Sequence, residues 1–274
     1  PGCLPKVAGD FPGNREFLIC RRFLVRGGPN IHPVASSAYQ PARSGSAIDE
    51  LMERASHALF KTDYFDAQSL SLKAMKAALR ARDFDRMARI CMPLQEARRQ
   101  LRHLATDTGR VTLVTQPLSA SEAYEPGCYL VAPPMVGIEA RAVRELLMRK
   151  KVPALVLCRE PTMSTGQWPM VAVAESDAAP FPPVVRVRLN APANPTPDIA
   201  WLLAAQEALG DAAIAKVNPR WPADHRVEDL LEWLDAVPDH EKLSQALQAT
   251  CLEALLAPAT VKARRRGVND PFSF

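Results

Sequence analysis

The sequence predicts a mixed α/β fold, in which helical hairpins precede a small, mostly parallel sheet and further helices at the C-terminal end pack on that sheet. Two observations support this fold class. Apolar residues recur at helical spacing before about residue 105 and again after residue 197, and the stretch between them contains short runs rich in Val and Leu. Within that stretch, residues 127–159 have the pattern strand, helix, strand, which indicates a βαβ unit with a parallel crossover.

The composition is that of a globular protein whose positive charge lies at its two ends. The 274 residues are 47% hydrophobic and 23% charged, which is enough to bury a core without metals or disulfides. The net charge is +4; residues 1–47 carry about +4 and residues 257–274 about +3, so the body between them carries about −3.

Nothing in the sequence predicts a secreted or membrane protein. No apolar run approaches the roughly 18 residues that span a bilayer, and the six cysteines never form Cys-x-x-Cys. Four of them, Cys91, Cys128, Cys158 and Cys251, fall on predicted buried faces, where a thiol behaves as a small apolar group. We therefore expect a cytoplasmic protein that does not contact a membrane.

Four regions are predicted along the chain. Residues 1–47 hold six of the twelve glycines and show no sustained period, so we expect a disordered leader. A helical region follows at 48–107 and an α/β region with C-terminal helices at 108–256. Residues 257–274 are expected to form a basic, disordered tail.

Three helices are predicted in the helical region. The first begins near Ser46, which forms a capping-box pattern with Asp49. The second and third begin near Asp63 and Asp83, whose carboxylates can cap the free amides of a first turn. Pro93 is expected to kink or restart the third helix, because proline removes a helical hydrogen bond.

Two short runs in this region resemble a known repeat. The run Asp63–Ala67 is similar to the turn into the second helix of a tetratricopeptide (TPR) repeat, and Asp83–Met87 echoes it. The resemblance covers residues 48–105. TPR units stack helix pairs into a groove that binds peptides, so the resemblance implies a protein-interaction surface. A plain helical hairpin with one extra helix explains the same residues, and both interpretations stay open.

Five strands are predicted after the helical region, at 111–115, 128–132, 154–158, 170–174 and 184–189. The run at 154–158 is apolar throughout, which suits the centre of a sheet. The last run alternates apolar and basic residues, which suits an edge strand with one solvated face.

Helices are predicted to return at the C-terminal end and to cover the sheet face that one crossover helix leaves exposed. The first begins near Asp198, and Gly210 is expected to end or interrupt it. Two more amphipathic helices are predicted at 227–234 and 242–256.

A ligand site is considered at the carboxyl ends of the strands, where open parallel sheets bind their ligands. The amides near Gly137 open a helix and could receive an anion, to which Arg159 adds charge, with Glu160 beside it. Glu139 in the same first turn argues against an anion, as does the lack of a dinucleotide or phosphate-loop motif. The alternative is a surface pair of Arg159 and Glu160 with little energetic value.

No catalytic residue, metal ligand or cofactor is predicted. The five histidines lack metal-ligand spacing, and His225 and His240, each preceded by an aspartate, indicate only a polar helix start. Cys158 could act as a nucleophile beside a histidine, but its apolar flank predicts a raised thiol pKa and an inert group. The basic run of Lys262 and Arg264–Arg266 offers only weak contact with nucleic acid.

From these features we expect a non-enzymatic interaction or scaffold protein whose partner is another protein. The alternative is a small-molecule or nucleotide-binding α/β module that uses the carboxyl ends of its strands. Nucleic-acid contact through the tail is the third interpretation. The sequence does not specify an oligomeric state.

Overall fold

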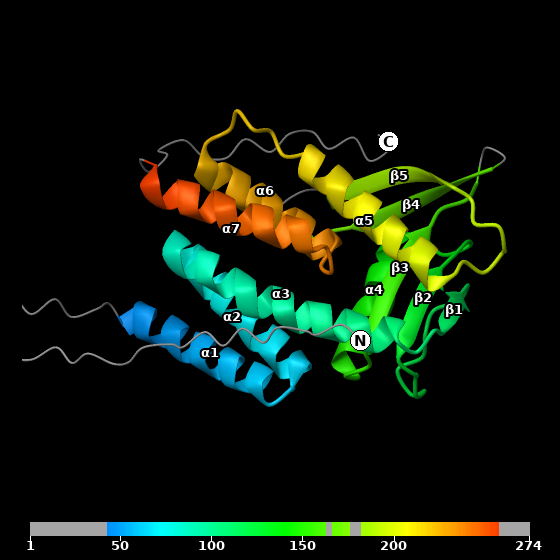
Figure 1. Ribbon diagram of the computed structural model, residues 1–274, viewed down its shortest axis with the longest axis horizontal. Helices are drawn as coiled ribbons and strands as arrows, with labels where there is room; N and C mark the ends of the chain where they lie inside the picture. The colour runs from blue at the N-terminus through cyan, green and yellow to red at the C-terminus, as the bar shows by residue number, and fades with distance from the viewer. Residues whose placement is uncertain (1–42, 163–165, 176–181, 258–274) are drawn as a thin grey trace, which may run out of the picture. The chain divides into compact units, whose positions relative to one another are not determined.

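Seven helices and five strands make up the part of the chain that the structure describes, residues 43–162, 166–175 and 182–257 of a computed structural model (Figure 1). The predicted mixed α/β class is confirmed. Nearly all of the predicted leader and of the predicted tail lies outside the described residues. The helices are α1 (Arg43–Phe60), α2 (Tyr64–Ala81), α3 (Phe84–Thr106), α4 (Gly137–Arg149), α5 (Ile199–Ala215), α6 (Ala223–Ala236) and α7 (Glu241–Leu256).

Antiparallel hairpins join α1, α2 and α3. Asp63 and Asp83 cap α2 and α3 as predicted, each accepting a hydrogen bond from the amide three residues later, at 3.3 and 3.0 Å. Thr62 and Arg82, which precede these caps, have φ angles of 59° and 51°, and this left-handed backbone reverses the chain.

Pro93 does not restart α3, which runs unbroken through it. Proline costs a helix roughly 3 kcal/mol because it removes one hydrogen bond and crowds the preceding turn. Buried side chains lie on both sides of Pro93, among them Ile90, Leu94 and Ala97. Burial of such side chains is worth about 1.5–3 kcal/mol each, which offsets the local cost.

The strands are β1 (Val111–Val114), β2 (Gly127–Val131), β3 (Ala154–Arg159), β4 (Gln167–Val173) and β5 (Val184–Asn190), and they lie in that order across one sheet. The central place of β3 and the edge place of β5 agree with the prediction. The sheet is half parallel rather than mostly parallel, because β1, β2 and β3 are parallel while β4 and β5 continue antiparallel. Among the described residues, no helix lies between β3 and β4 or between β4 and β5, and strands joined without a crossover helix pair antiparallel.

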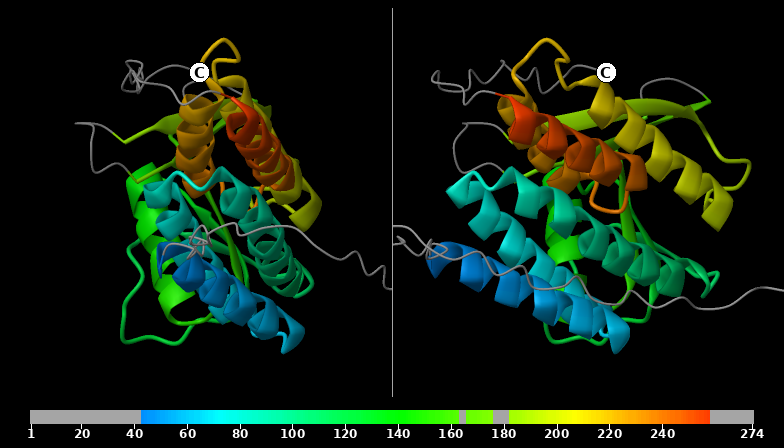
Figure 2. Two further views of the ribbon diagram at one scale, coloured as in Figure 1. Left: turned by 90° about the vertical axis from the view of Figure 1, so that its left-hand side faces the viewer. Right: turned by 60° about the vertical axis from the view of Figure 1, so that its left-hand side comes forward.

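The sheet is covered on both faces (Figure 1, Figure 2). On one face, Val143 of α4 packs in a cluster with Tyr129 and Val131 of β2. Cys128 and Leu130 of the same strand point to the other face, as alternation requires. There α3 packs on β2 and β3, and α5 packs on β4 and β5.

The C-terminal helices pack on the sheet, as predicted, and they also pack on the N-terminal helices. α7 lies along α3, so both regions share one core that includes Leu94, Leu155 and Leu247. Gly210 neither ends nor interrupts α5, contrary to the prediction. None of the described helices combines the length and the apolarity needed to cross a bilayer.

Four arginine side chains hold the end of α6 and the turn that follows it, residues 235–239, which we call the arginine-held turn. Arg98 and Arg102 of α3 donate to two of its carbonyl oxygens, at 3.2 and 2.8 Å. Arg144 of α4 donates to two more, at 2.7 and 3.0 Å, and Arg141 pairs with the carboxylate that begins the turn. Helices from both faces of the sheet therefore meet at this turn.

The turn lies where the sheet is least continuous. β3 and β4 pair at two positions, Cys158 with Val171 and Arg159 with Met170, whereas β4 and β5 pair at seven. Residues 236–239 border a small space that both β3 and β4 also line. The contacts of the turn therefore add to the few backbone hydrogen bonds between β3 and β4.

The turn can be tested at Arg144. Replacing Arg144 with Met keeps much of its apolar stem but removes the donors to two carbonyls at the end of α6. We expect the free energy of unfolding, measured by urea denaturation, to fall by about 2–4 kcal/mol. Arg149→Met, at an exposed position of the same helix, is the control and should change it by less than about 0.5 kcal/mol. Equal losses in the two variants would contradict this role.

Candidate functional site

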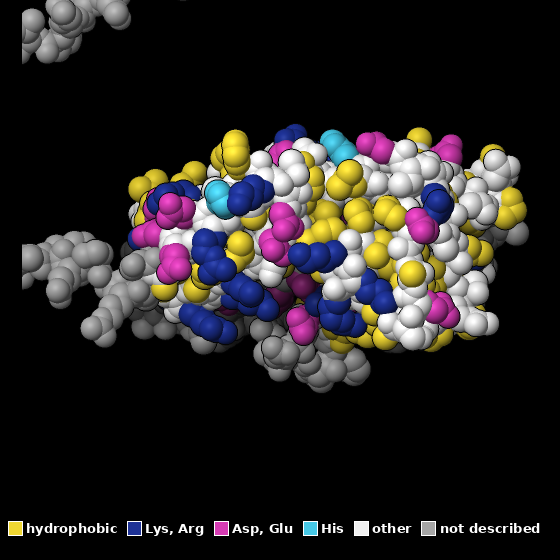
Figure 3. Space-filling model, turned by 90° about the horizontal axis from the view of Figure 1, so that it is seen from below, with side chains coloured by type: hydrophobic (Ala, Val, Ile, Leu, Met, Phe, Trp, Pro, Cys, Tyr) yellow, Lys and Arg dark blue, Asp and Glu magenta, His cyan; other side chains and the backbone are white. Residues whose placement is uncertain are grey.

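A cleft with a volume of about 410 Å³ lies between the α2–α3 hairpin and α6. Figure 3 shows the hollowed face from below, with acidic side chains inside the hollow and Lys and Arg side chains beside it. The apolar part of the lining comes from all three helices: Leu72, Met75, Leu79, Leu94, Leu231 and Leu234. A volume of this size falls within the roughly 300–1,000 Å³ of ligand pockets.

Helical periodicity places these side chains along the cleft. On α2 the lining residues are Leu72, Met75, Lys76 and Leu79, which follow the i, i+3, i+4, i+7 spacing of one helix face. The sequence analysis did not assign a binding surface to this face. The spacing of Leu72 and Leu79 was the available signal.

Charged groups line the same cleft. Lys76 and Arg98 belong to the α2–α3 side, and Glu228 and Glu232 to α6. Arg98 is buried, and burial lowers the pKa of its guanidinium to about 10 because the charged form loses water. Its Nε atom has no hydrogen-bond acceptor among the described residues.

One end of the cleft is closed by an ion-pair network around Asp235. Its carboxylate pairs with Arg141 and accepts the Glu175 amide at 2.7 Å. Burial acts to raise the pKa of Asp235, but the bonds from Arg141 and from that amide outweigh burial and lower the pKa below its ordinary value. Arg141 also lies 3.3 Å from the Glu175 carboxylate. At this end of the cleft the carboxylates of Asp235 and Glu175 are therefore balanced by the Arg141 guanidinium.

The structure places the three sequence-predicted ligand residues in separate surroundings. Gly137 lies so close to β4 that an added Cβ would be 2.6 Å from a methyl group of Val173. The guanidinium of Arg159 lies 4.5 Å above the ring of Trp168. Glu160 forms a two-point ion pair with Arg186 of β5, with both contacts at 2.9 Å.

Gly137 and Arg159 do not share one site. Val173 belongs to the side-chain cluster under α4, whereas Trp168 packs against the cluster on the opposite face of the sheet. The first turn of α4 is also occupied, because the Glu139 carboxylate accepts the Val136 amide at 2.7 Å. An anion at Gly137 would meet this carboxylate.

The four cysteines predicted to be buried are buried and unpaired. Burial raises the pKa of Cys91 and of Cys158 to about 12 and that of Cys128 to about 11, so these groups stay protonated at neutral pH. Cys158 is therefore buried, as expected, with its thiol in the protonated form.

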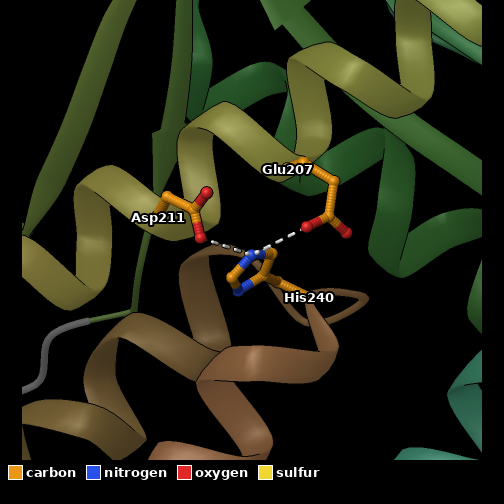
Figure 4. Close-up of side chains that lie close together, drawn as sticks. All are labelled: Glu207, Asp211 and His240. Atoms are coloured by element: carbon orange, nitrogen blue, oxygen red, sulfur yellow. Dashed lines mark ion pairs between the residues drawn. The ribbon is translucent and has the colours of Figure 1, made fainter.

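A second cluster joins α5 to the start of α7. His240 is fully buried, and its Nε2 lies 3.3 Å from Glu207 and 3.4 Å from Asp211 (Figure 4). Its Nδ1 accepts the Leu243 amide at 3.2 Å, which makes His240 the N-cap of α7 and confirms the predicted polar helix start. Lys242 lies beside the same two carboxylates, at 3.3 and 3.1 Å.

The three ligand-type atoms of this cluster lie within 4.8 Å of one another, so a metal ion has to be considered. The chemistry does not fit one. Because Nδ1 accepts a hydrogen bond, the neutral ring carries its proton on Nε2 and offers no lone pair to a metal there. The Lys242 ammonium already supplies positive charge to Glu207 and Asp211. We assign the cluster a structural role.

Gly210 explains how the His240 ring fits against α5. A Cβ at position 210 would lie 2.0 Å from Cγ of His240, so only glycine leaves room for the ring. We expect Gly210→Ala to lower the free energy of unfolding by about 1–3 kcal/mol, although alanine is the better helix former by about 1 kcal/mol.

The same substitution in a variant that lacks the His240 ring isolates the contact between Gly210 and His240. In His240→Ser the cap is kept and the ring is removed, so adding Gly210→Ala should stabilise the protein by up to about 1 kcal/mol. Both differences are measured by chemical denaturation. Stabilisation by Gly210→Ala with His240 present would disprove the close approach.

His240 should also make stability depend on pH. Burial lowers its pKa below the ordinary 6.5, although Glu207 and Asp211 act to raise it and Lys242 to lower it further. The unfolded chain then binds a proton more readily, so stability is lost as the pH falls below about 6.5, by at most about 1.4 kcal/mol per pH unit. Denaturation of wild type and His240→Asn between about pH 5 and 7 checks this, and identical profiles would refute it.

Comparison with known proteins does not identify a family. No protein-family model, curated protein or solved structure matches this chain significantly.

Proposed function

We propose that this chain is a non-catalytic interaction or scaffold protein that binds an apolar segment of another protein in the cleft between α2, α3 and α6. The observation that carries the proposal is the apolar lining of that cleft, which surrounds about 410 Å³. Apolar surface in contact with water is unfavourable by roughly 25 cal/mol per Å², so a partner that covers the lining gains free energy.

The chemistry of the lining favours binding over catalysis. Among the described residues that line the cleft there is no histidine, cysteine, serine or threonine, and the carboxylates of Asp235 and Glu175 are paired with Arg141. Cysteines elsewhere in the described chain are buried thiols without a disulfide partner. Such thiols also support the cytoplasmic setting that we propose, because that compartment is reducing.

The helical hairpins support the same proposal. α2 and α3 provide one side of the cleft, and they lie in the region that resembles TPR units. In TPR proteins stacked hairpins form a groove for peptides. Here α6 supplies the opposite wall, so the proposed groove is built by the hairpin together with the C-terminal helices.

A small apolar molecule is the second candidate for the same cleft. The volume and the mainly leucine lining suit such a ligand, and the buried Arg98 guanidinium could receive its polar group. This candidate replaces the alternative of a ligand at the carboxyl ends of the strands, whose expected residues do not meet.

The proposal is tested by filling the cleft. Leu231→Trp adds bulk to a half-buried position of the α6 wall, and Leu255→Trp makes the same change at an exposed position of α7 outside the lining. Full-length protein is captured from the cells that express it, and bound proteins are quantified by mass spectrometry. We expect a partner that wild type and Leu255→Trp retain and that Leu231→Trp loses by about tenfold or more.

Other outcomes separate the candidates. A partner that Leu231→Trp retains binds elsewhere and contradicts the proposal. A co-purified small molecule lost only from Leu231→Trp, without a protein partner, supports the second candidate instead. Denaturation of both variants verifies that they fold with a stability within about 1.5 kcal/mol of wild type.

A further inference from the structure

Two small spaces lie beside the arginine-held turn, and Asp239 lines both of them. The first space is also lined by β3, β4 and Gln206 of α5, and the second by Gln68 of α2 and by α4. Each has a volume of about 30 Å³. Because a cavity of about 10–15 Å³ holds one water molecule, each space has room for about one or two.

The glutamine side chains that line the two spaces have polar atoms without a partner. Gln206 is 2% exposed, and neither its Oε1 nor its Nε2 atom is hydrogen-bonded to a described residue. Gln68 is 4% exposed, and its Oε1 atom likewise lacks a donor within the described part of the chain. Most buried polar atoms in folded proteins are hydrogen-bonded to protein or to ordered water. The two glutamines therefore indicate partners that the described chain does not supply.

The carboxylate of Asp239 also lacks a direct donor among the described residues, although Arg98, Arg102 and Arg144 surround it. All three arginines donate instead to backbone carbonyl oxygens of the arginine-held turn. Burial raises the pKa of Asp239 because the charged form loses water, and the three positive charges act to lower it. Asp239 keeps some accessible surface and lines both spaces, so donors to its carboxylate can come from there.

The backbone around the first space adds further polar groups. The pairing of β3 with β4 ends at Cys158 and Val171. Residues 155–157 of β3 and 172–173 of β4 lie beyond that pair and line the space. Their backbone groups that point toward the opposite strand have no ladder partner in it, and buried backbone groups are almost always paired. The first space therefore lies where the sheet itself lacks hydrogen bonds.

We infer that ordered water molecules bind in both spaces and join the Asp239 carboxylate to Gln206 in the first and to Gln68 in the second. In the first space the same water also links the backbone of β3 and β4 beyond the end of their ladder. The arginines thus hold the carbonyl oxygens of the turn, and the waters hold its carboxylate. This inference is independent of the proposed function.

Water suits these spaces better than another ligand does. A volume of about 30 Å³ is far below the roughly 300 Å³ of the smallest ligand pockets. A cation would be repelled by the three arginines, and an anion by Asp239 itself. Water both donates and accepts, which matches a carboxylate that needs donors and an amide that needs both kinds of partner. Spaces that stay dry have apolar linings, unlike these two.

A crystal structure of the full-length protein at high resolution tests the two sites directly. We expect at least one ordered water in each space, within about 3.0 Å of a carboxylate oxygen of Asp239. The water in the first space should also lie within hydrogen-bonding distance of Gln206, and that in the second of Gln68. A space without ordered water, or a glutamine that donates directly to Asp239, would overturn the inference for that space.

Oxygen-17 magnetic relaxation dispersion tests the same sites in solution, because it counts waters that stay inside a protein. Gln206→Met and Gln68→Met keep the length of the side chain and remove its polar atoms. We expect each variant to lose about one long-lived water relative to wild type, because a bound water needs two to four polar partners. Gln245→Met, at an exposed position of α7, is the matched control and should leave the count unchanged.

The two spaces fail independently in this measurement. An unchanged count in Gln206→Met would refute the bridge in the first space, and an unchanged count in Gln68→Met would refute that in the second. An equal loss in Gln245→Met would show that the change is not specific to these sites and would also refute the inference. Circular dichroism verifies that the three variants keep the helix content of wild type.

Discussion

The arginine-held turn is the interaction on which the arrangement of the helices depends. The last carbonyls of a helix have no partners within it, and the last ones of α6 are buried where α3 and α4 approach. Arg144 supplies donors to two of them, and its positive charge also suits the negative end of the helix dipole. Because Arg98 and Arg102 hold the other side of the turn, α6 is fixed relative to both faces of the sheet. The α6 wall of the cleft takes its position from these bonds.

Features that depend on neighbouring residues could be predicted from the sequence. The caps at Asp63 and Asp83, the βαβ unit and the buried cysteines each follow from patterns a few residues long. The arginine-held turn could not, because it joins α3 and α4 to a turn far along the chain. A surface arginine and a buried arginine have the same local sequence pattern.

The predicted ligand residues are separated by the two faces of the sheet. They lie at the carboxyl ends of β2 and β3, which are parallel neighbours, but the side chains of strands alternate between the two faces. Gly137 packs on one face of β4, and Arg159 reaches Trp168 on the other face. The cleft lies among helices. In the sequence its leucines have the pattern of ordinary core residues, and only the folded structure shows that α6 lies opposite α2.

The contact between Gly210 and His240 has a consequence for cooperativity. Glycine weakens α5 locally, and histidine is a less common N-cap than aspartate or serine, so each helix is less favourable alone than it could be. The ring fills the space over Gly210 only when both helices are packed together. This contact therefore stabilises α5 and α7 only when the two helices are packed together. Such mutual dependence favours an all-or-none folding transition over independent formation of α5 and α7.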